Sequence, residues 1–225
     1  MIKINSFKFN VSTNLRKQII PMPSIIKQAS GIYFMGRKVR SLVYTTDIAI
    51  IRNTNADAIL AVYPFTPDPA IMQAINIAAD KPVFAGVGGG LTSGKRSADM
   101  SLFAESLGSI GVVVNAPTSS ETIKMIEDVV DIPILLTVVS GEVDFDEKFA
   151  SGIDVLNVSG GHNTPKIVAE IRKKYPEVPI IATGGHSDET ITAVLEAGAN
   201  AITYTPPTTS SLFARKMQEY REFGF

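Results

Sequence analysis

The sequence contains no cysteine among its 225 residues. This absence excludes disulfide bonds, thiolate nucleophiles, cysteine zinc sites and iron–sulfur clusters. Neither charge is in excess, because the sequence has 21 Lys and Arg residues and 22 Asp and Glu residues, which give a formal net charge of -1. No long basic run appears, so the sequence does not predict a nucleic-acid partner.

Long apolar runs are missing as well. Ile132–Val139 is among the longest apolar stretches, and it is far too short to cross a bilayer. The first ten residues, Met1–Asn10, alternate Lys with apolar side chains and lack the continuous apolar segment of a signal peptide. We therefore expect a cytoplasmic protein without a membrane partner.

From Ser41 onward, short apolar runs alternate with turn-rich junctions and helical patterns, about 23 residues for each unit. The runs are rich in Val and Ile and mostly continuous, which is typical of parallel strands covered on both faces. Eight such units predict an α/β fold, a closed (βα)8 TIM barrel, with an open doubly wound sheet as the alternative. The expected strands are Leu42–Thr45, Ala58–Tyr63, Val83–Val87, Gly111–Asn115, Ile134–Val139, Val155–Ser159, Ile180–Thr183 and Ala201–Tyr204.

We expect one domain over residues 1–225, with eight βα units from residue 41 and an N-terminal extension before it. Within the extension, Ser24–Gln28 is predicted to form a short helix. Gly31–Met35 and Lys38–Val43 are predicted to form a hairpin that leads into the first strand. This extension should cover the N-terminal mouth of the barrel, where apolar side chains would otherwise be exposed.

Helix starts are marked by hydroxyl side chains. Thr66 and Thr164 each precede a proline, which suits an N-cap followed by the first helical position. The segment Thr118–Glu121 matches a capping box. Ser187, followed by two acidic residues, predicts a further helix start.

In a TIM barrel the loops that follow the strands converge on the active site. Here those loops are rich in hydroxyls, amides and glycine, which favours a small, polar, oxygen-rich ligand. Two similar segments, Ser159–His162 and Thr183–His186, lie 24 residues apart and carry a glycine pair each. Glycine pairs let the backbone approach a ligand, and the N-termini of the helices that follow favour anions. Alternatively, the glycines only allow tight turns between strand and helix. We predict that ligand or phosphate is bound by Asn115, Asn157, Ser159, Gly160, Gly161, Thr183, Gly184, Gly185, Thr208 and Thr209.

Ile180–Gly185 followed by Glu196–Ile202 resembles the last two units of the phosphate-binding TIM-barrel superfamily. That superfamily includes sugar-phosphate epimerases, 2-keto-3-deoxy-phosphogluconate-type aldolases, thiazole synthase and FMN-dependent barrels. The resemblance covers about 45 residues and implies a phosphate-bearing ligand but no particular reaction. Two departures stand out: Val155–Ser159 lacks the Schiff-base lysine of the aldolases, and Tyr204–Pro207 lacks the Gly-Thr-Arg-Phe-like turn of the FMN barrels.

A near match to a phosphate-binding P-loop occurs at Gly89–Arg96. It fails at Arg96, where Ser or Thr would meet magnesium, and a barrel does not favour nucleotide hydrolysis. The segment is instead interpreted either as a glycine-hinged flap that carries Lys95 to the mouth or as a solvated surface loop.

Four residues are candidates for catalysis. Asp47 could act as a general base or cap the following helix, and Lys95 could contact phosphate or form a Schiff base. His162 and His186, the only histidines, each follow a glycine pair and are candidate acid–base groups. No metal-ligating set is predicted, because metal sites usually need three or four ligands.

These observations favour an enzyme that acts on a small phosphorylated or anionic metabolite by isomerase, epimerase or lyase-type proton transfer. The alternatives are a hydrolase that uses a histidine with Asp47, an FMN-binding oxidoreductase, and a non-enzymatic barrel that senses a phosphometabolite. Neither FMN nor a divalent metal is favoured as a cofactor, and a homo-oligomer is compatible with the sequence.

Overall fold

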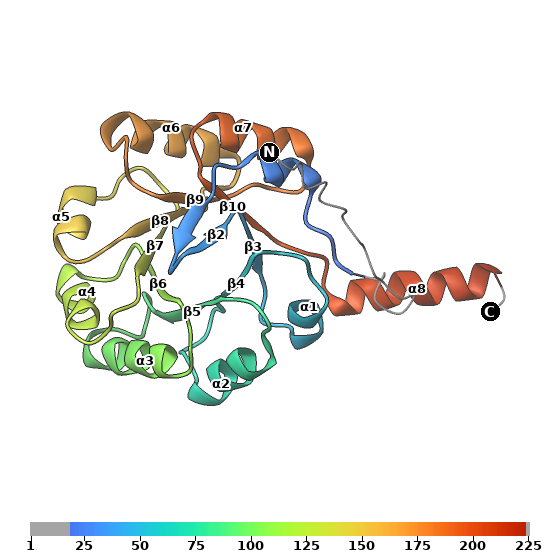
Figure 1. Cartoon of the computed structure of the whole chain (residues 1–225), viewed down its shortest axis with the longest axis horizontal. Coiled ribbons are helices and arrows are strands. Elements are labelled where there is room, and N and C mark those ends of the chain that lie inside the picture. Colours follow the sequence, from blue (N-terminus) through green and yellow to red (C-terminus); the bar gives the residue numbers. More distant parts are fainter. Residues whose placement is uncertain (1–18, 224–225) are drawn as a thin grey trace, which may run out of the picture.

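A computed structural model describes residues 19–223. Eight parallel strands close into a barrel in the order β10-β3-β4-β5-β6-β7-β8-β9, which confirms the predicted TIM barrel (Figure 1). Each strand lies within or close to a predicted apolar run, with ends that differ by a few residues. The strands are β3 Ser41–Tyr44, β4 Ala58–Ala61, β5 Val83–Gly88, β6 Gly111–Asn115, β7 Ile134–Val138, β8 Val155–Val158, β9 Ile180–Thr183 and β10 Ala201–Tyr204.

Helices follow the barrel strands, and α1 to α7 each bury apolar side chains against them (Figure 1). A short 3-10 helix, η3 (Gly161–Asn163), precedes α6. The helices are α1 Ile48–Arg52, α2 Pro69–Ala78, α3 Gly94–Ser106, α4 Ser120–Glu127, α5 Phe145–Ala150, α6 Thr164–Lys174, α7 Asp188–Glu196 and α8 Thr209–Phe223. Within the described residues, no helix is long and apolar enough to span a membrane.

The predicted helix starts are partly wrong. The predicted capping box at Thr118–Glu121 is wrong, because the cap of α4 is Ser119, whose hydroxyl accepts the backbone N–H of Thr122. Helix α6 begins at Thr164 itself, so this residue is not its cap. Ser187 does cap α7, where it accepts from a backbone N–H, as predicted.

Helix α2 begins later than the Thr66-Pro67 pair suggested. Asp68 is its cap and Pro69 its first residue. The Asp68 carboxylate accepts from the N–H groups of Ala70 and Ile71, which a threonine hydroxyl two residues earlier cannot reach. The loop after β4 is therefore four residues longer than predicted, because β4 also ends two residues earlier, at Ala61.

The N-terminal extension covers the N-terminal mouth, as predicted, although residues 1–18 lie outside the described part. Helix η2 spans Ser24–Gln28, and the hairpin strands are β1 Ile32–Phe34 and β2 Arg37–Val39. The predicted strand Lys38–Val43 is wrong in one respect, because it divides into the end of β2 and the start of β3. In Figure 1 the hairpin lies across the centre of the barrel.

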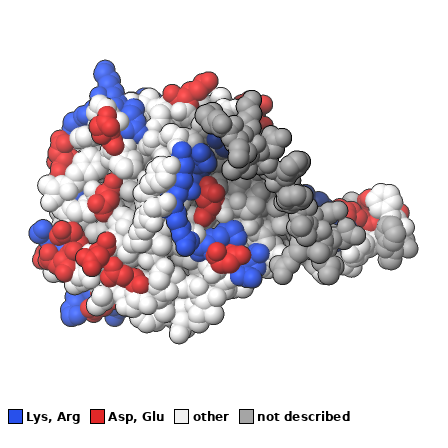
Figure 2. Space-filling model, in the orientation of Figure 1, with Lys and Arg blue, Asp and Glu red and all other residues white. Residues whose placement is uncertain are grey.

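The hairpin closes the barrel with an aromatic contact. The ring of Phe34 packs edge-on against Phe84 of β5, with ring centroids 4.8 Å apart. Phe34 and Val39 join the apolar cluster that fills the barrel interior. Figure 2 shows positive and negative side chains mixed on this face of the molecule.

Candidate functional site

Neutral polar side chains form the floor of the C-terminal mouth. Asn157 of β8 is only 4% exposed, and its amide donates to the Thr137 hydroxyl at 3.0 Å. The Thr203 hydroxyl donates to the Asn157 carbonyl oxygen at 3.5 Å, and Thr183 donates to Ser159 at 3.1 Å. Asn157, predicted to bind the ligand, is thus engaged by threonines from two other strands.

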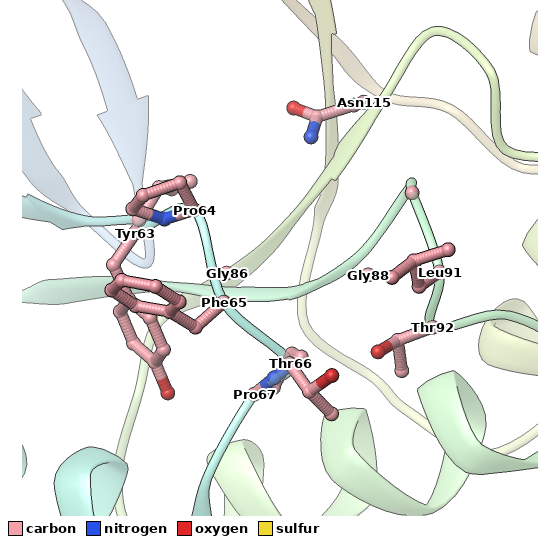
Figure 3. A pocket seen from close by; sticks show the side chains of 12 residues that line it. Tyr63, Pro64, Phe65, Thr66, Pro67, Gly86, Gly88, Leu91, Thr92 and Asn115 are labelled. Carbon is pink, nitrogen blue, oxygen red and sulfur yellow. The ribbon is translucent and has the colours of Figure 1, made fainter.

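The larger cavity at this mouth has a volume of about 470 Å³ and lies among the loops after β4, β5 and β6 (Figure 3). No charged side chain lines it. An aromatic and proline wall from the β4 loop faces a glycine-rich wall from the β5 loop, with β6 contributing one amide. The lining residues are Val62, Tyr63, Pro64, Phe65, Thr66, Pro67, Gly86, Gly88, Gly90, Leu91, Thr92 and Asn115.

Three polar side chains converge on this cavity. In Figure 3 the Asn115 amide points into it, and the hydroxyls of Thr66 and Thr92 turn toward each other across it. Thr92 is only 5% exposed. Within the described residues, no hydrogen bond engages any of these three side chains. Thr92 is buried, Asn115 is half-buried and Thr66 is exposed, so all three side chains are free to bond a molecule in the cavity.

The geometry of the β5 loop depends on glycine. Gly89 has a φ of 111°, a conformation that side chains rarely adopt, and its N–H donates to the carbonyl of Thr92 at 3.1 Å. A Cβ at Gly89 would collide with the backbone nitrogen of Asn115. Glycine at this position therefore lets the loop close tightly over β6 and places Thr92 opposite the β4 loop.

A second cavity of about 330 Å³ adjoins the first and shares Val62, Tyr63 and Pro64 with it. It lies among the loops after β3, β4 and β10. Asp47 and Thr208, both predicted from the sequence, are among its lining residues.

Asp47 caps helix α1. Its carboxylate accepts from the N–H groups of Ala49 at 2.8 Å and Ile50 at 3.3 Å. Partial burial by itself would raise the pKa of Asp47, but the Thr209 hydroxyl and these N–H groups outweigh it and lower that pKa below its usual value. The carboxylate is therefore ionised at neutral pH, and the capping interpretation of this residue is confirmed.

The glycine pairs of the predicted phosphate grip lie on the other side of the mouth and line neither cavity. A Cβ at Gly184 would come within 2.7 Å of the Ile202 side chain and 2.9 Å of Ile191. A Cβ at Gly160 would collide with Ile167 in α6. These two glycines allow the following helix to pack closely on the barrel, which favours the turn interpretation.

The remaining predicted residues are not gathered around the cavities. His162, in η3, and His186, after β9, are exposed, and the His186 ring centroid lies 6.4 Å from that of Tyr204. Lys95 lies in the first turn of α3, is 83% exposed and pairs with Asp99 at 2.7 Å. The predicted flap is thus shorter than expected, because α3 begins at Gly94.

Sequence reasoning missed Tyr63, Thr66 and Thr92 as site residues. Tyr63 and Thr66 lie in the loop directly after β4, so their position in a βα loop was a usable signal. Thr92 lies in the segment that resembles a P-loop, and in that motif the lysine, here Lys95, is the expected functional residue. Among residues 19–223, no cluster of three or more His, Cys, Asp or Glu residues could hold a metal ion.

Comparison with known proteins gives likeness in structure but not in sequence, since no family model and no curated protein matches this chain. A phosphoenolpyruvate phosphomutase from Streptomyces platensis subsp. rosaceus is 14% identical, with a TM-score of 0.60 over 83% of this chain and 82% of that chain. A phosphonopyruvate hydrolase in complex with oxalate and Mg++ is 12% identical, with a TM-score of 0.64 over 85% of each chain. A mandelate oxidase is 14% identical, with a TM-score of 0.62 over 78% of this chain and 67% of that chain.

Identities this low show the shared fold alone. The TIM-barrel part of the resemblance seen in the sequence is confirmed. The narrower assignment to the phosphate-binding superfamily is not shown by structures of 12–14% identity.

Proposed function

We propose that this protein is an enzyme of small-molecule metabolism that binds an anionic or phosphorylated metabolite in the cavity between the β4, β5 and β6 loops. The observation that carries the proposal is the group of unengaged polar side chains, Asn115, Thr66 and Thr92, around a cavity of about 470 Å³. A space of this size suits a small metabolite.

The chemistry of the lining points to oxygen atoms on the ligand. An amide NH2 and two hydroxyls can together donate four hydrogen bonds, and carboxylate or phosphoryl oxygens accept them well. The structural neighbours that are named for phosphonopyruvate and phosphoenolpyruvate, one of them with oxalate bound, support a small acidic ligand.

For the reaction we propose proton transfer of the isomerase or lyase kind. Asp47 borders the adjoining cavity and is ionised, so it can accept a proton or orient a substrate group there. His186 follows β9 near Tyr204, and His162 follows β8, so both remain candidates to act from the opposite rim. Lys95 is the weakest candidate, because it is committed to Asp99 on the surface of α3.

The binding step is tested by thermal unfolding in the presence of inorganic phosphate, oxalate or phosphonopyruvate. A ligand that binds only the native state raises the melting temperature by mass action. Asn115→Ala should reduce that rise, whereas Asn53→Ala, at the opposite end of the barrel, should keep it. A rise that is equal in all three proteins would place the anion elsewhere, and no rise with any probe would overturn the anionic-ligand proposal.

The proton-transfer step is tested separately. The protein is incubated in D2O with 2-oxo acids and sugar phosphates, and loss of a carbon-bound proton signal is followed by NMR. Exchange that is lost in Asp47→Asn, or in one histidine variant, supports the proposal. A yellow purified protein would instead favour the flavin-dependent alternative.

A further inference from the structure

The larger cavity has an apolar side, which hydrogen bonds to an anion would not use. In Figure 3 the rings of Tyr63 and Phe65 lie on one side of this cavity, and Leu91 lies on the other. Phe65 is 75% exposed, and Leu91 is fully exposed. Single exposed apolar side chains need no explanation, but two that line one cavity from opposite loops mark a place where a ligand can remove apolar surface from water.

Tyr63 offers the cavity its ring rather than its hydroxyl. The hydroxyl accepts the backbone N–H of Asp68, which is the cap of α2, at 2.8 Å. This hydrogen bond holds the phenol oxygen at the start of α2. The part of Tyr63 that remains for a ligand is therefore hydrocarbon, like the side chain of Phe65.

The loop that carries Phe65 is stiffened by proline. Pro64 directly precedes Phe65, and Pro67 follows two residues later. Each proline ring fixes its own φ, so this short loop has few backbone conformations. Asp68 then anchors the end of the loop by accepting from two backbone N–H groups of α2. A stiff wall loses little entropy when a ligand binds, so this side of the cavity is preorganised for an apolar group.

The polar groups of the cavity are neutral. Asn115, Thr66 and Thr92 can donate four hydrogen bonds, which matches the lone pairs on the two oxygens of a carboxylate. No Lys, Arg or His side chain among the described residues lines the cavity. Lys95, at the start of α3, pairs with Asp99 instead. Because a dianionic phosphoryl group costs more to desolvate without a cation than a carboxylate does, the lining favours the carboxylate.

On the basis of the proposed anion binding in this cavity, we propose that the ligand is a small carboxylic acid with an apolar group at its other end. The apolar group has about the size of a phenyl ring or a branched alkyl chain, and it lies between Phe65 and Leu91. The carboxylate accepts hydrogen bonds from the neutral donors. A cavity of about 470 Å³ suits a molecule of this size.

Three matched probes test the proposal by ligand-observed NMR titration of the full-length protein. Propionate has the carboxylate alone, 3-phenylpropionate adds the ring, and 3-phenylpropanol keeps the ring without the charge. Burial of apolar surface favours binding in proportion to its area, so 3-phenylpropionate should bind at least about tenfold more tightly than propionate. It should also bind more tightly than 3-phenylpropanol. Equal affinity of propionate and 3-phenylpropionate overturns the proposal.

Variants of the two rim residues locate the ring. Phe65→Ala and Leu91→Ala should each lose most of the affinity that the phenyl group adds, while the affinity for propionate stays the same. Ile77→Ala is the matched control, because Ile77 is 76% exposed on α2 and does not line the cavity. A phenyl contribution that survives both rim variants, or that falls equally in Ile77→Ala, overturns the proposal.

Further outcomes separate this proposal from the proposed function. If phosphate or oxalate raises the melting temperature but no phenyl acid binds more tightly than propionate, the anion site stands and the apolar acid is overturned. If 2-phenylethyl phosphate binds more tightly than 3-phenylpropionate, the carboxylate assignment alone is overturned. If 3-phenylpropanol binds as tightly as 3-phenylpropionate, or if no probe binds, both the anionic ligand and the apolar acid are overturned.

Discussion

Gly160 and Gly184, on one side of the barrel mouth, and Gly90, on the other, differ in what an added Cβ would meet. Beside β8 and β9, Gly160 and Gly184 lie against isoleucine side chains of the neighbouring helices and strand, and they make room for tight packing. Beside β5, Gly90 has no heavy atom within 4 Å of an added Cβ, and it lines the larger cavity. A glycine pair in a sequence therefore predicts that another group comes close to the backbone. It does not predict whether that group is a ligand or another part of the protein.

The asparagines of the two halves differ in the same manner. Asn157 is buried and hydrogen-bonded to barrel threonines, whereas the Asn115 amide faces the cavity without a partner in the described part of the chain. The Asn157 amide is therefore hydrogen-bonded within the protein, whereas the Asn115 amide still has its hydrogen-bonding groups free. The four predictions below test this contrast, from the largest expected effect to the smallest.

Gly184→Val should destabilise the protein by about 3 kcal/mol, because overpacking a core costs that much when neighbours cannot move. The new side chain meets Ile202 and Ile191 rather than solvent. Gly90→Ala, in the open β5 loop, should change the free energy of unfolding by less than about 0.5 kcal/mol. Denaturant unfolding measures both. A stable Gly184→Val that has lost its response to phosphate would restore the predicted anion grip.

His162→Asn and His186→Asn test whether the β8 and β9 side supplies catalysis while the β4 to β6 side supplies binding. If one histidine is the acid or base, its loss should lower turnover about 100-fold. Stability and ligand affinity should change little, because both side chains are exposed and line neither cavity. Steady-state kinetics with unchanged KM would establish the division. Full activity in both variants would assign the histidines to structure alone.

Asn157→Ala and Asn115→Ala should have opposite consequences. The first leaves the buried Thr203 hydroxyl and the half-buried Thr137 hydroxyl without this partner and should cost about 2 kcal/mol of stability. The second removes an amide that has no protein partner, so stability should hardly change while ligand affinity falls about tenfold. Thermal unfolding and titration calorimetry separate the two effects. Equal loss of stability in both variants would contradict the contrast between them.

The same contrast shows which features of the fold and of the candidate site can be predicted from the sequence. Continuous Val- and Ile-rich runs predicted all eight strands, because burial on both faces of a barrel strand leaves a strong local signature. Which βα loops leave a cavity depends on side-chain packing between distant segments, such as Ile202 and Ile191 against Gly184, and no local pattern records that. Asn115 and Asp47, which line the two cavities, were predicted because polar groups at strand ends are visible in the local sequence. Thr66 and Thr92 were missed because their hydroxyls come to face one cavity only in the folded mouth.

Asp47→Ala should have the smallest effect, about 1 kcal/mol at neutral pH, which is typical of a lost helix cap. The cost should depend on pH in a defined direction. The folded-state pKa of Asp47 lies below its usual value, so its ionised form stabilises the native state above the unfolded pKa of about 4. That stabilisation is lost as the pH falls through the lowered folded-state pKa.

Unfolding midpoints at pH 7 and pH 3 measure this dependence. The difference between wild type and Asp47→Ala should shrink at the lower pH. Asp47→Asn is the control, because an asparagine cap accepts the same N–H groups without titrating, so its own stability relative to Asp47→Ala should stay constant. A difference between wild type and Asp47→Ala that is constant with pH would mean that the carboxylate does not favour the folded state through its charge. Asp47 would then stabilise helix α1 only through its hydrogen bonds to the backbone N–H groups, and not through its charge.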